Sequence, residues 1–303
     1  MAETSARMKA ALLPDRGVVK VAGDDARTFL HDLLTANILT LTPGEARFGA
    51  LLSPQGKIFA DFIIVEAPPQ AGSGFFLDVP IDLAKPLVDK LNLYKLRSRV
   101  IVENLSEVLG VMAAWDGTGM TALGLTYPDP RLGALGLRAM LPAHRAAEAA
   151  ADLGAVVVAA GEYEARRIAL AIPRGGADFK YGDAFPHEAD MDQLGGVDFA
   201  KGCYVGQEVV SRMEHRGIAR TRVLPVRYRG ATPQPGEPIT SGQRQIGTMG
   251  SASAGHGLAL LRIDRMAAAL REGEPLVAAG IPIEPLKPNW AHFAVPDAVK
   301  AAE

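Results

Sequence analysis

Cys203, the only cysteine of the chain, has neighbours that suggest chemistry rather than burial. Gly202 and Gly206 stand on either side of it, and glycines allow the tight turning that leaves a thiol accessible. Lys201 precedes the cysteine and arginines beginning with Arg212 follow it. Cations that approach a sulfur favour its thiolate over the free thiol, whose usual pKa is about 8.5. We therefore expect a reactive or metal-ligating Cys203, with Lys201 taking part in its chemistry.

Two interpretations of the arginines after the cysteine remain open. A solvated linker would keep these side chains in water, whereas an anion clamp would use their planar guanidinium forks to bind a carboxylate or a phosphate. Spacing alone does not decide between the two. The arginines concerned are Arg212, Arg216, Arg220 and Arg222.

No other catalytic motif stands out in the sequence. There is no nucleophile elbow, phosphate-binding loop or dinucleotide fingerprint, and no arrangement of Ser, His and Asp typical of a hydrolase. The histidines lack metal-ligand spacing, so we predict no metal site and interpret most of them as surface or satisfied core residues. They are His31, His144, His187, His215, His256 and His292.

The elements that must position Cys203 alternate between strands and helices. Residues 16–21, 48–52 and 58–65 favour strands, and an apolar stripe including Phe29 and Leu33 predicts a helix that begins near Asp25. From Pro173 and Gly175-Gly176 to about Leu194 the pattern is irregular, and long irregular stretches inside folded proteins are often functional. Beyond Gly217, short β-like runs between Gly and Pro turns predict a small closed barrel. The fold class is therefore α+β with a β-rich C-terminal domain.

Bulk composition sets limits on location and partners. The chain has 303 residues, 48% of them hydrophobic and 22% charged, which is enough for two or three cores. A net charge of -2 argues against direct nucleic-acid binding, and no apolar run approaches the roughly 18 residues of a membrane span. One cysteine excludes an internal disulfide, and no secretory pattern opens the chain, so we expect a cytoplasmic protein.

The stretch Lys201-Gly202-Cys203-Tyr204-Val205-Gly206-Gln207-Glu208 resembles the K-G-C-Y-x-G-Q-E signature of the YgfZ family, relatives of the glycine-cleavage T-protein. Further segments resemble the family in the expected order: residues 23–35, 52–58, 96–98, and 186–188 followed by 192–194. The resemblance implies a three-domain ring: two α+β domains, which interleave in such rings, and a C-terminal β-barrel. We predict domains at residues 1–108, 109–217 and 218–303.

The same resemblance implies a function. It predicts tetrahydrofolate bound centrally and a role in assembling or repairing four-iron clusters of target enzymes, including cluster-dependent RNA-modifying enzymes. Iron–sulfur enzymes or cluster carriers would be the partners. The signature is carried to Cys203 and Lys201, with the neighbouring signature positions at Gly202, Tyr204, Gly206, Gln207 and Glu208. A single thiolate cannot hold a four-iron cluster alone, because such a cluster needs four ligands.

Aminomethyl transfer to tetrahydrofolate, the T-protein activity, is the alternative. T-proteins carry an acidic pair after the first hairpin, where this chain has Ala60 and Asp61, and they lack the cysteine signature. A pterin presents adjacent N–H donors that a carboxylate can accept, so Asp61 and Glu188 are the pterin candidates, and Arg212 is the candidate for the folate glutamate tail. Ala171 replaces a glycine expected in another family motif. An RNA-associated module is a third, less favoured reading.

Overall fold

The chain forms two structural units that interleave along the sequence. The computed structural model describes residues 7–217, 219–296 and 298–302. The first unit comprises Met1–Leu52, Phe59–Tyr163 and Leu194–Val205, and the second comprises Ser53–Ile58, Glu164–Gln193 and Gly206–Glu303. Within the described residues, no helix is both long enough and apolar enough to cross a membrane.

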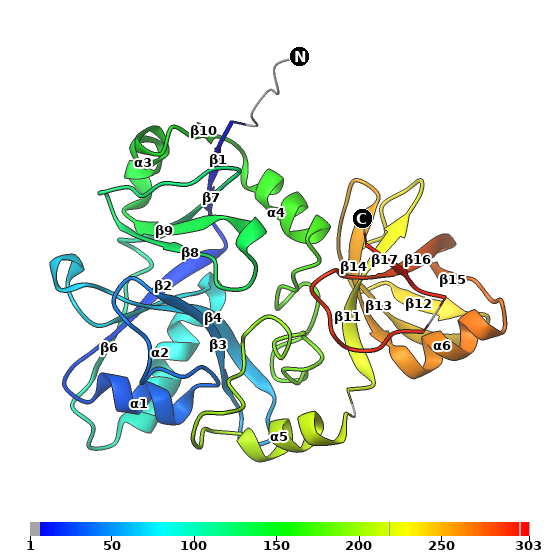
Figure 1. The fold of residues 1–303 in the computed structure, drawn as a ribbon, viewed down its shortest axis with the longest axis horizontal. Helices are drawn as coiled ribbons and strands as arrows, with labels where there is room; N and C mark the ends of the chain where they lie inside the picture. Colours follow the sequence, from blue (N-terminus) through cyan, green and yellow to red (C-terminus); the bar gives the residue numbers. More distant parts are fainter. Residues whose placement is uncertain (1–6, 218, 297, 303) are drawn as a thin grey trace. The chain divides into compact units, whose positions relative to one another are not determined.

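A five-stranded sheet packed against two helices forms one part of the first unit (Figure 1). Its strands, in spatial order, are β3 (Ala46–Leu52), β4 (Ile58–Glu66), β5 (Phe75–Pro80), β2 (Arg16–Ala22) and β6 (Ile101–Asn104). The helices are α1 (Ala26–Leu33) and α2 (Ile81–Lys95). Leu30 of α1 and Leu87 of α2 are fully buried against the strands, because each helix turns one apolar stripe toward the sheet.

A second five-stranded sheet completes the first unit. Its strands, in spatial order, are β10 (Val156–Val157), β1 (Lys9–Leu13), β7 (Gly110–Trp115), β9 (Leu137–Leu141) and β8 (Leu125–Pro128). Helix α3 (Ala146–Asp152) packs on it through Ala149 and Ala150. Short 3-10 helices occur at η1 (Pro69–Ala71), η2 (Gly133–Leu135) and η3 (Ala143–Arg145). Because β1 joins this sheet and β2 joins the other, the two sheets interleave along the chain.

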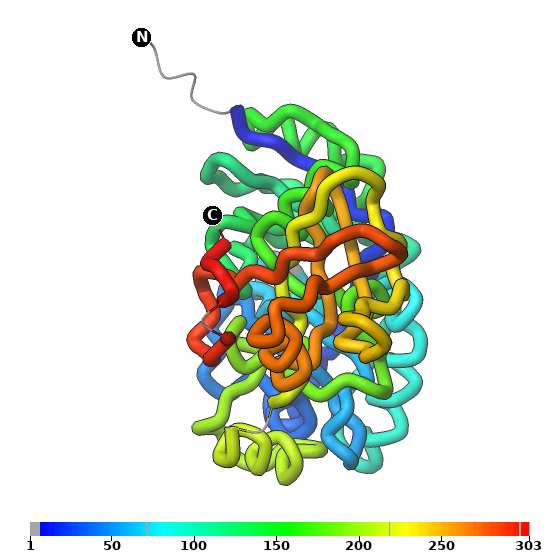
Figure 2. Tube along the Cα trace, turned by 90° about the vertical axis from the view of Figure 1, so that its right-hand side faces the viewer, coloured from blue at the N-terminus to red at the C-terminus, as the bar shows by residue number. Residues whose placement is uncertain are grey.

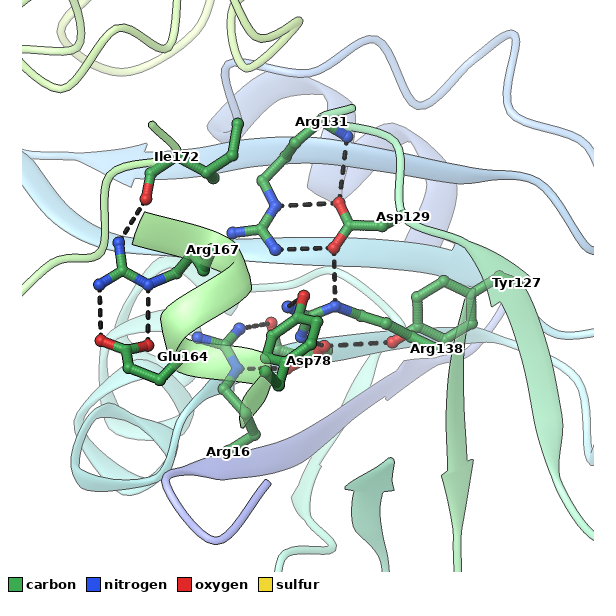
Figure 3. Close-up of polar contacts among 10 residues, drawn as sticks. Arg16, Asp78, Tyr127, Asp129, Arg131, Arg138, Glu164, Arg167 and Ile172 are labelled. Atoms are coloured by element: carbon green, nitrogen blue, oxygen red, sulfur yellow. Dashed lines mark hydrogen bonds and ion pairs between the residues drawn. The ribbon is translucent and has the colours of Figure 1, made fainter. Parts of the chain in front are cut away.

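Buried charges join the two sheets of the first unit (Figure 3). The Asp78 carboxylate on β5 accepts from Arg16 of β2 at 2.5 Å and from Arg138 of β9 at 2.5 Å. The Tyr127 hydroxyl of β8 donates to the same carboxylate at 3.2 Å. Arg138 also pairs with Asp129 at 2.9 Å. Asp78 is fully buried, so each charge in the network depends on its partners.

The second unit begins with the irregular segment and a helix. Helix α4 (Ala160–Ala169) contains the boundary between the units, and residues 170–206, all of them described, form no regular helix or strand. Arg167 of α4 fastens this segment, since it pairs with Asp178 at 2.8 Å and donates to the Ser251 hydroxyl at 2.7 Å. Helix α5 (Gln207–Arg216) follows. The irregular segment expected from the sequence is confirmed.

The C-terminal part of the second unit is a closed six-stranded barrel. Its strands, in spatial order, are β11 (Thr221–Tyr228), β14 (His256–Arg262), β13 (Arg244–Ser253), β12 (Pro238–Ser241), β15 (Leu276–Ala278) and β16 (Ile281–Lys287). β16 pairs back with β11 and closes the barrel, and β17 (Lys300–Ala301) extends β16. Helix α6 (Ile263–Arg271) contributes Met266 to the barrel core, and Figure 2 shows the chain passing through these elements from yellow to red. The predicted α+β class and barrel are confirmed.

Candidate functional site

Cys203 lies on the last segment of the first unit, residues 194–205, and its side chain is exposed. The accessibility expected from the sequence is therefore confirmed. Gly206 has a φ of +80° and a Cβ there would stand 2.5 Å from the Ser53 carbonyl oxygen, so this position requires glycine. Gly202 is not among the glycines with positive φ, and a Cβ there would meet only His31 Nε2 at 3.9 Å, so the fold does not require glycine at this position.

Lys201 fastens the cysteine segment to the end of α1. Its ammonium donates to the backbone carbonyls of His31, Leu34 and Ala36, the last at 3.1 Å. The carbonyls at a helix C-terminus lack intrahelical donors and form the negative end of the helix dipole, so a cation is well placed there. Lys201 is 7% exposed, and its polar end is committed to these acceptors.

Two further residues hold the same segment in place. The Thr35 hydroxyl donates to the Gly196 carbonyl at 2.6 Å, and the Asp198 amide donates to the Thr35 carbonyl at 3.0 Å. The Asp198 carboxylate then accepts the amides of Ala200 and Lys201, at 2.8 and 3.0 Å. The backbone leading to Cys203 is thus fixed by hydrogen bonds even though it has no regular secondary structure.

Two groups buried beside the segment that carries Cys203, Lys201 and His31, have lowered pKa values. Burial lowers the pKa of Lys201 to about 8, against the opposing effect of the Asp198 and Asp32 carboxylates. Burial, reinforced by the charge of Lys201, also lowers the pKa of His31. The His31 Nδ1 accepts the Ile38 amide at 3.3 Å, and its Nε2 lies 3.9 Å from the place of a Cβ on residue 202. A neutral imidazole therefore faces the backbone next to Cys203.

Tyr204 has a buried hydroxyl without a hydrogen-bond partner among the described residues. Burial and then the Asp198 charge raise its pKa to about 12, so the phenol stays protonated at neutral pH. The Lys201 ammonium lies 5.2 Å from the centre of the Tyr204 ring, within cation–π range. The Lys-Gly-Cys-Tyr stretch thus places an exposed thiol between two anchored side chains.

The remainder of the signature belongs to the second unit. Gly206 precedes α5, and Gln207 and Glu208 form its first turn. Glu208 pairs with Arg212 one turn later at 2.6 Å, with both side chains more than half exposed. Arg212 is therefore solvated and paired within its own helix. Its predicted contact with a folate glutamate tail stays a prediction.

The two pterin candidates lie in different units and differ in their present partners. Asp61 is on β4 of the first unit, 7% exposed, and its charge helps to raise the pKa of Arg16. Glu188 belongs to the second unit, where its carboxylate accepts the Phe185 amide at 2.9 Å. Asp61 presents a buried carboxylate of the acceptor type that a pterin requires, and Glu188 and Arg212 contact the Phe185 amide and the Glu208 carboxylate.

Arg222 has a buried structural role that neither interpretation of the arginines predicts. Its two terminal nitrogens bind the Asp192 carboxylate at 2.8 Å each, and one of them also donates to the His187 carbonyl at 2.9 Å. The guanidinium stacks 4.2 Å from the Phe293 ring centre. A third acceptor, Asp190, lies at 3.1 Å. Arg222 is therefore neither a solvated linker residue nor a free anion clamp.

Comparisons with known proteins agree on a family. Residues 220–293 match the family model described as the CAF17 C-terminal beta-barrel domain. The chain is 31% identical over 293 residues to the mitochondrial iron-sulfur cluster assembly factor IBA57 homolog of Pyricularia oryzae, covering 88% of this chain and 75% of that protein. The Mycosarcoma maydis homolog is 35% identical over 246 residues, covering 77% of this chain and 60% of the relative. The human protein of the same name is 28% identical, covering 82% and 76%.

The fold has a solved counterpart. The crystal structure of the glycine cleavage system aminomethyltransferase T from Bartonella henselae superimposes with a TM-score of 0.75, covering 97% of this chain and 89% of that chain at 16% identity. This confirms the predicted T-protein-like fold. The chain spans 60% of the Mycosarcoma maydis relative and 57% of the Neurospora crassa relative.

Two expectations from the sequence need correction. The resemblance pointed to the YgfZ type, whereas the matching relatives are IBA57 proteins, so the expectation is confirmed at the level of the superfamily. The prediction of a cytoplasmic location is wrong, because these relatives are named as mitochondrial. The prediction uses the single cysteine and the lack of a secretory pattern, and neither observation separates the cytoplasm from another reducing compartment.

Proposed function

Because the chain belongs to the IBA57 family of iron–sulfur cluster assembly factors, we propose that it takes part in building iron–sulfur clusters on other proteins through the thiolate of Cys203. The observation that carries this proposal is the exposed thiol on a backbone segment that Lys201, Thr35 and Asp198 hold in place. The four-iron type of cluster and client enzymes that modify RNA belong to the same proposal.

The chemistry of a lone thiolate defines the partner. Sulfur of Cys203 is a soft ligand suited to iron, but a cluster needs further ligands that one cysteine does not supply. The partner must therefore be a cluster carrier or client that brings its own thiolates. Cys203 would occupy one coordination position on the cluster, which is the cargo, and would leave it when the cluster moves on.

Lys201 is a positioning residue in this proposal. Its ammonium is bound to carbonyls of α1 and the residues that follow, so it fixes the backbone next to the sulfur and does not itself contact the cargo. A fixed ligand loses less conformational freedom on binding than a mobile one, and this lowers the cost of forming the complex. The adjacent His31 and Tyr204 contribute neutral surfaces beside the thiol.

The test is complementation with matched variants. Cells that lack the protein would receive wild type, Cys203→Ser, or Cys203→Ser combined with Ser211→Cys, which moves the thiol onto α5. Aconitase and a second four-iron enzyme would be assayed at equal expression. We expect only wild type to restore both activities. Full restoration by Cys203→Ser would overturn the role of the thiol, and restoration by the double variant would overturn the role of its position.

Tetrahydrofolate binding is a separate part of the proposal, supported by the buried Asp61 carboxylate. We propose that Asp61 accepts N–H groups of the pterin, while folate contacts of Glu188 and Arg212 remain predictions from the sequence. Equilibrium dialysis with 5-formyltetrahydrofolate would compare wild type with Asp61→Asn and with Asp82→Asn, an exposed control on α2. We expect weaker binding for Asp61→Asn alone. Equal affinity for all three proteins would contradict this assignment.

Aminomethyl transfer is the second candidate, and the likeness in fold to aminomethyltransferase T favours it. In that case Asp61 would orient the amine and Cys203 would be incidental. The assay is the formation of methylenetetrahydrofolate from an aminomethylated lipoyl carrier. Turnover by wild type and by Cys203→Ser alike would favour transfer, and absence of turnover by folded protein would exclude it.

A further inference from the structure

Three potential metal ligands converge in the second unit, whereas Cys203 belongs to the first unit. His187, Asp192 and Glu214 each offer one ligand atom, and these atoms all lie within 4.8 Å of one another. The His187 Nε2 is 3.0 Å from a Glu214 carboxylate oxygen. The spacings of 5 and 22 residues match no metal motif, which explains why the sequence predicts no metal site.

The distances suit a first-row divalent ion. Such an ion binds nitrogen and oxygen ligands at about 2.0–2.2 Å, so two ligands of one ion lie roughly 3–4 Å apart. The three ligand atoms, which lie within 4.8 Å of one another, must therefore move slightly closer together to share one ion. Glu214 can supply that movement, because its side chain is 44% exposed, whereas those of His187 and Asp192 are 2% and 3% exposed.

A second layer of contacts holds the two buried ligands in place before any ion arrives. Arg222 binds both oxygens of Asp192 and also the backbone carbonyl of His187. The Gln193 side chain donates to Asp192 at 2.7 Å. Metal-binding carboxylates and imidazoles are commonly oriented by such outer hydrogen bonds. Arg222 is itself fixed by stacking on Phe293.

The charge balance also favours a cation. Arg222 places one positive charge against the Asp192 carboxylate, and Glu214 adds a second carboxylate to the same set of ligands. Glu214 has no Lys or Arg within ion-pair distance in the described part of the chain, and the His187 ring is its ion-pair partner.

A cavity adjoins the ligands and provides room for a further coordination position. His187 and Glu214 line a space of about 560 Å³, together with Arg220 and Phe293. Catalytic metal sites keep one coordination position open for water or substrate, whereas in structural sites protein groups fill every position. Arg220 at the wall would attract an anion to the metal.

We propose that His187, Asp192 and Glu214 bind one divalent first-row cation, with an open position toward the cavity. One imidazole and two carboxylates form the mixed nitrogen and oxygen set that suits Zn²⁺, Fe²⁺ or Mn²⁺. The site is independent of Cys203 and requires neither folate nor a cluster. It would add a metal-dependent binding site to the barrel-bearing unit.

The experiment uses the full chain with Cys203→Ser as background, so that the thiol cannot bind the probe. After treatment with a chelator, Zn²⁺ binding at pH 7.5 would be measured by calorimetry, and Mn²⁺ binding by electron paramagnetic resonance. We expect one ion per chain and a rise in unfolding temperature with Zn²⁺. Glu214→Gln should weaken binding by at least the roughly 10–100-fold seen for loss of an outer-shell partner.

Controls make the result decisive. Glu208→Gln changes an exposed carboxylate on the same helix and should leave the affinity unchanged. His187→Gln should remove binding, and Glu214→Gln serves where the buried substitution fails to fold. Absence of saturable binding in the background protein would overturn the proposal. So would equal affinity for the Glu214→Gln and Glu208→Gln variants, which would indicate surface binding only.

Discussion

Lys201 and Arg138 are both buried cations in the first unit, but they are held by different kinds of partner. Arg138 pairs with the carboxylates of Asp78 and Asp129, and although burial alone would lower its pKa, Tyr163 and these carboxylates raise the pKa well above the usual arginine value. Lys201 donates only to backbone carbonyls, and burial lowers its pKa to about 8.

The two cations therefore differ in whether they keep their charge as the pH rises. Arg138 stays charged at every pH the folded chain experiences and joins the two sheets, Asp78 in one and Asp129 beyond the end of the other. Lys201 lies on the segment that carries the exposed thiol, and it approaches neutrality just above physiological pH. Ion pairs therefore hold Arg138 between the two sheets, whereas backbone carbonyls hold Lys201 beside the cysteine.

The largest loss of stability should follow from breaking the buried ion pairs of Asp78. Asp78→Asn leaves Arg16 and Arg138 buried without their shared carboxylate, and loss of one partner of a buried pair costs about 3–5 kcal/mol in the free energy of unfolding. Urea unfolding followed by circular dichroism would measure the loss. Asp89→Asn, which breaks the exposed Lys85–Asp89 pair, should cost less than about 0.5 kcal/mol. Similar losses for both variants would show that the buried ion pairs of Asp78 contribute no more to stability than the exposed Lys85–Asp89 pair.

Lys201→Met should cost somewhat less at pH 7. The substitution leaves the carbonyls at the end of α1 without their donor, and each buried acceptor left unpaired costs roughly 1–3 kcal/mol, offset in part because the ammonium no longer has to be buried. We expect a net loss of about 2–3 kcal/mol, together with faster alkylation of Cys203 by iodoacetamide. Lys85→Met is the exposed control. An unchanged alkylation rate would show that Lys201 does not hold the thiol segment.

The titratable character of Lys201 gives a pH dependence of known sign. The folded chain binds the proton with a pKa of about 8 and the unfolded chain near the usual 10.5, so between these values the unfolded chain holds more protons. Stability contributed by Lys201 must then rise with pH. The difference in unfolding free energy between wild type and Lys201→Met should grow by about 2 kcal/mol from pH 7.5 to 9.5. A constant difference would place the folded pKa near 10.5.

The sequence predicts the elements with strong local patterns and misses those that depend on distant partners. The barrel strands and the helix stripe of α1 follow from turn residues and apolar spacing. β1 (Lys9–Leu13) is missed, because the short run Lys-Ala-Ala-Leu-Leu lacks alternation and its main partner, β7, lies about a hundred residues away. The exposure of Cys203 follows from its polar and glycine neighbours.

The orientation of charged side chains is what the sequence does not determine. Arg212 and Arg222 belong to one cluster in sequence, yet one is solvated on α5 and the other is buried against Asp192. Lys201 reaches carbonyls some 165–170 residues earlier in the chain. Ala171 has a φ of +59°, which explains why a glycine is expected at that position, and alanine tolerates it here inside a buried cluster.

The smallest effect tests the third side chain of the cysteine segment. Tyr204→Phe removes a buried hydroxyl that has no hydrogen-bond partner among the described residues, so the desolvation cost of that group disappears while the ring keeps its contact with Lys201. We expect a gain in unfolding free energy of about 1 kcal/mol or less. Tyr228→Phe is the matched control, since the Tyr228 hydroxyl bonds to Thr232 at 3.3 Å and its removal should be neutral or mildly destabilising. A clear loss of stability for Tyr204→Phe would mean that the hydroxyl has a hydrogen-bond partner in solution. The segment that carries Cys203 would then be held by that hydrogen bond as well as by the carbonyl contacts of Lys201.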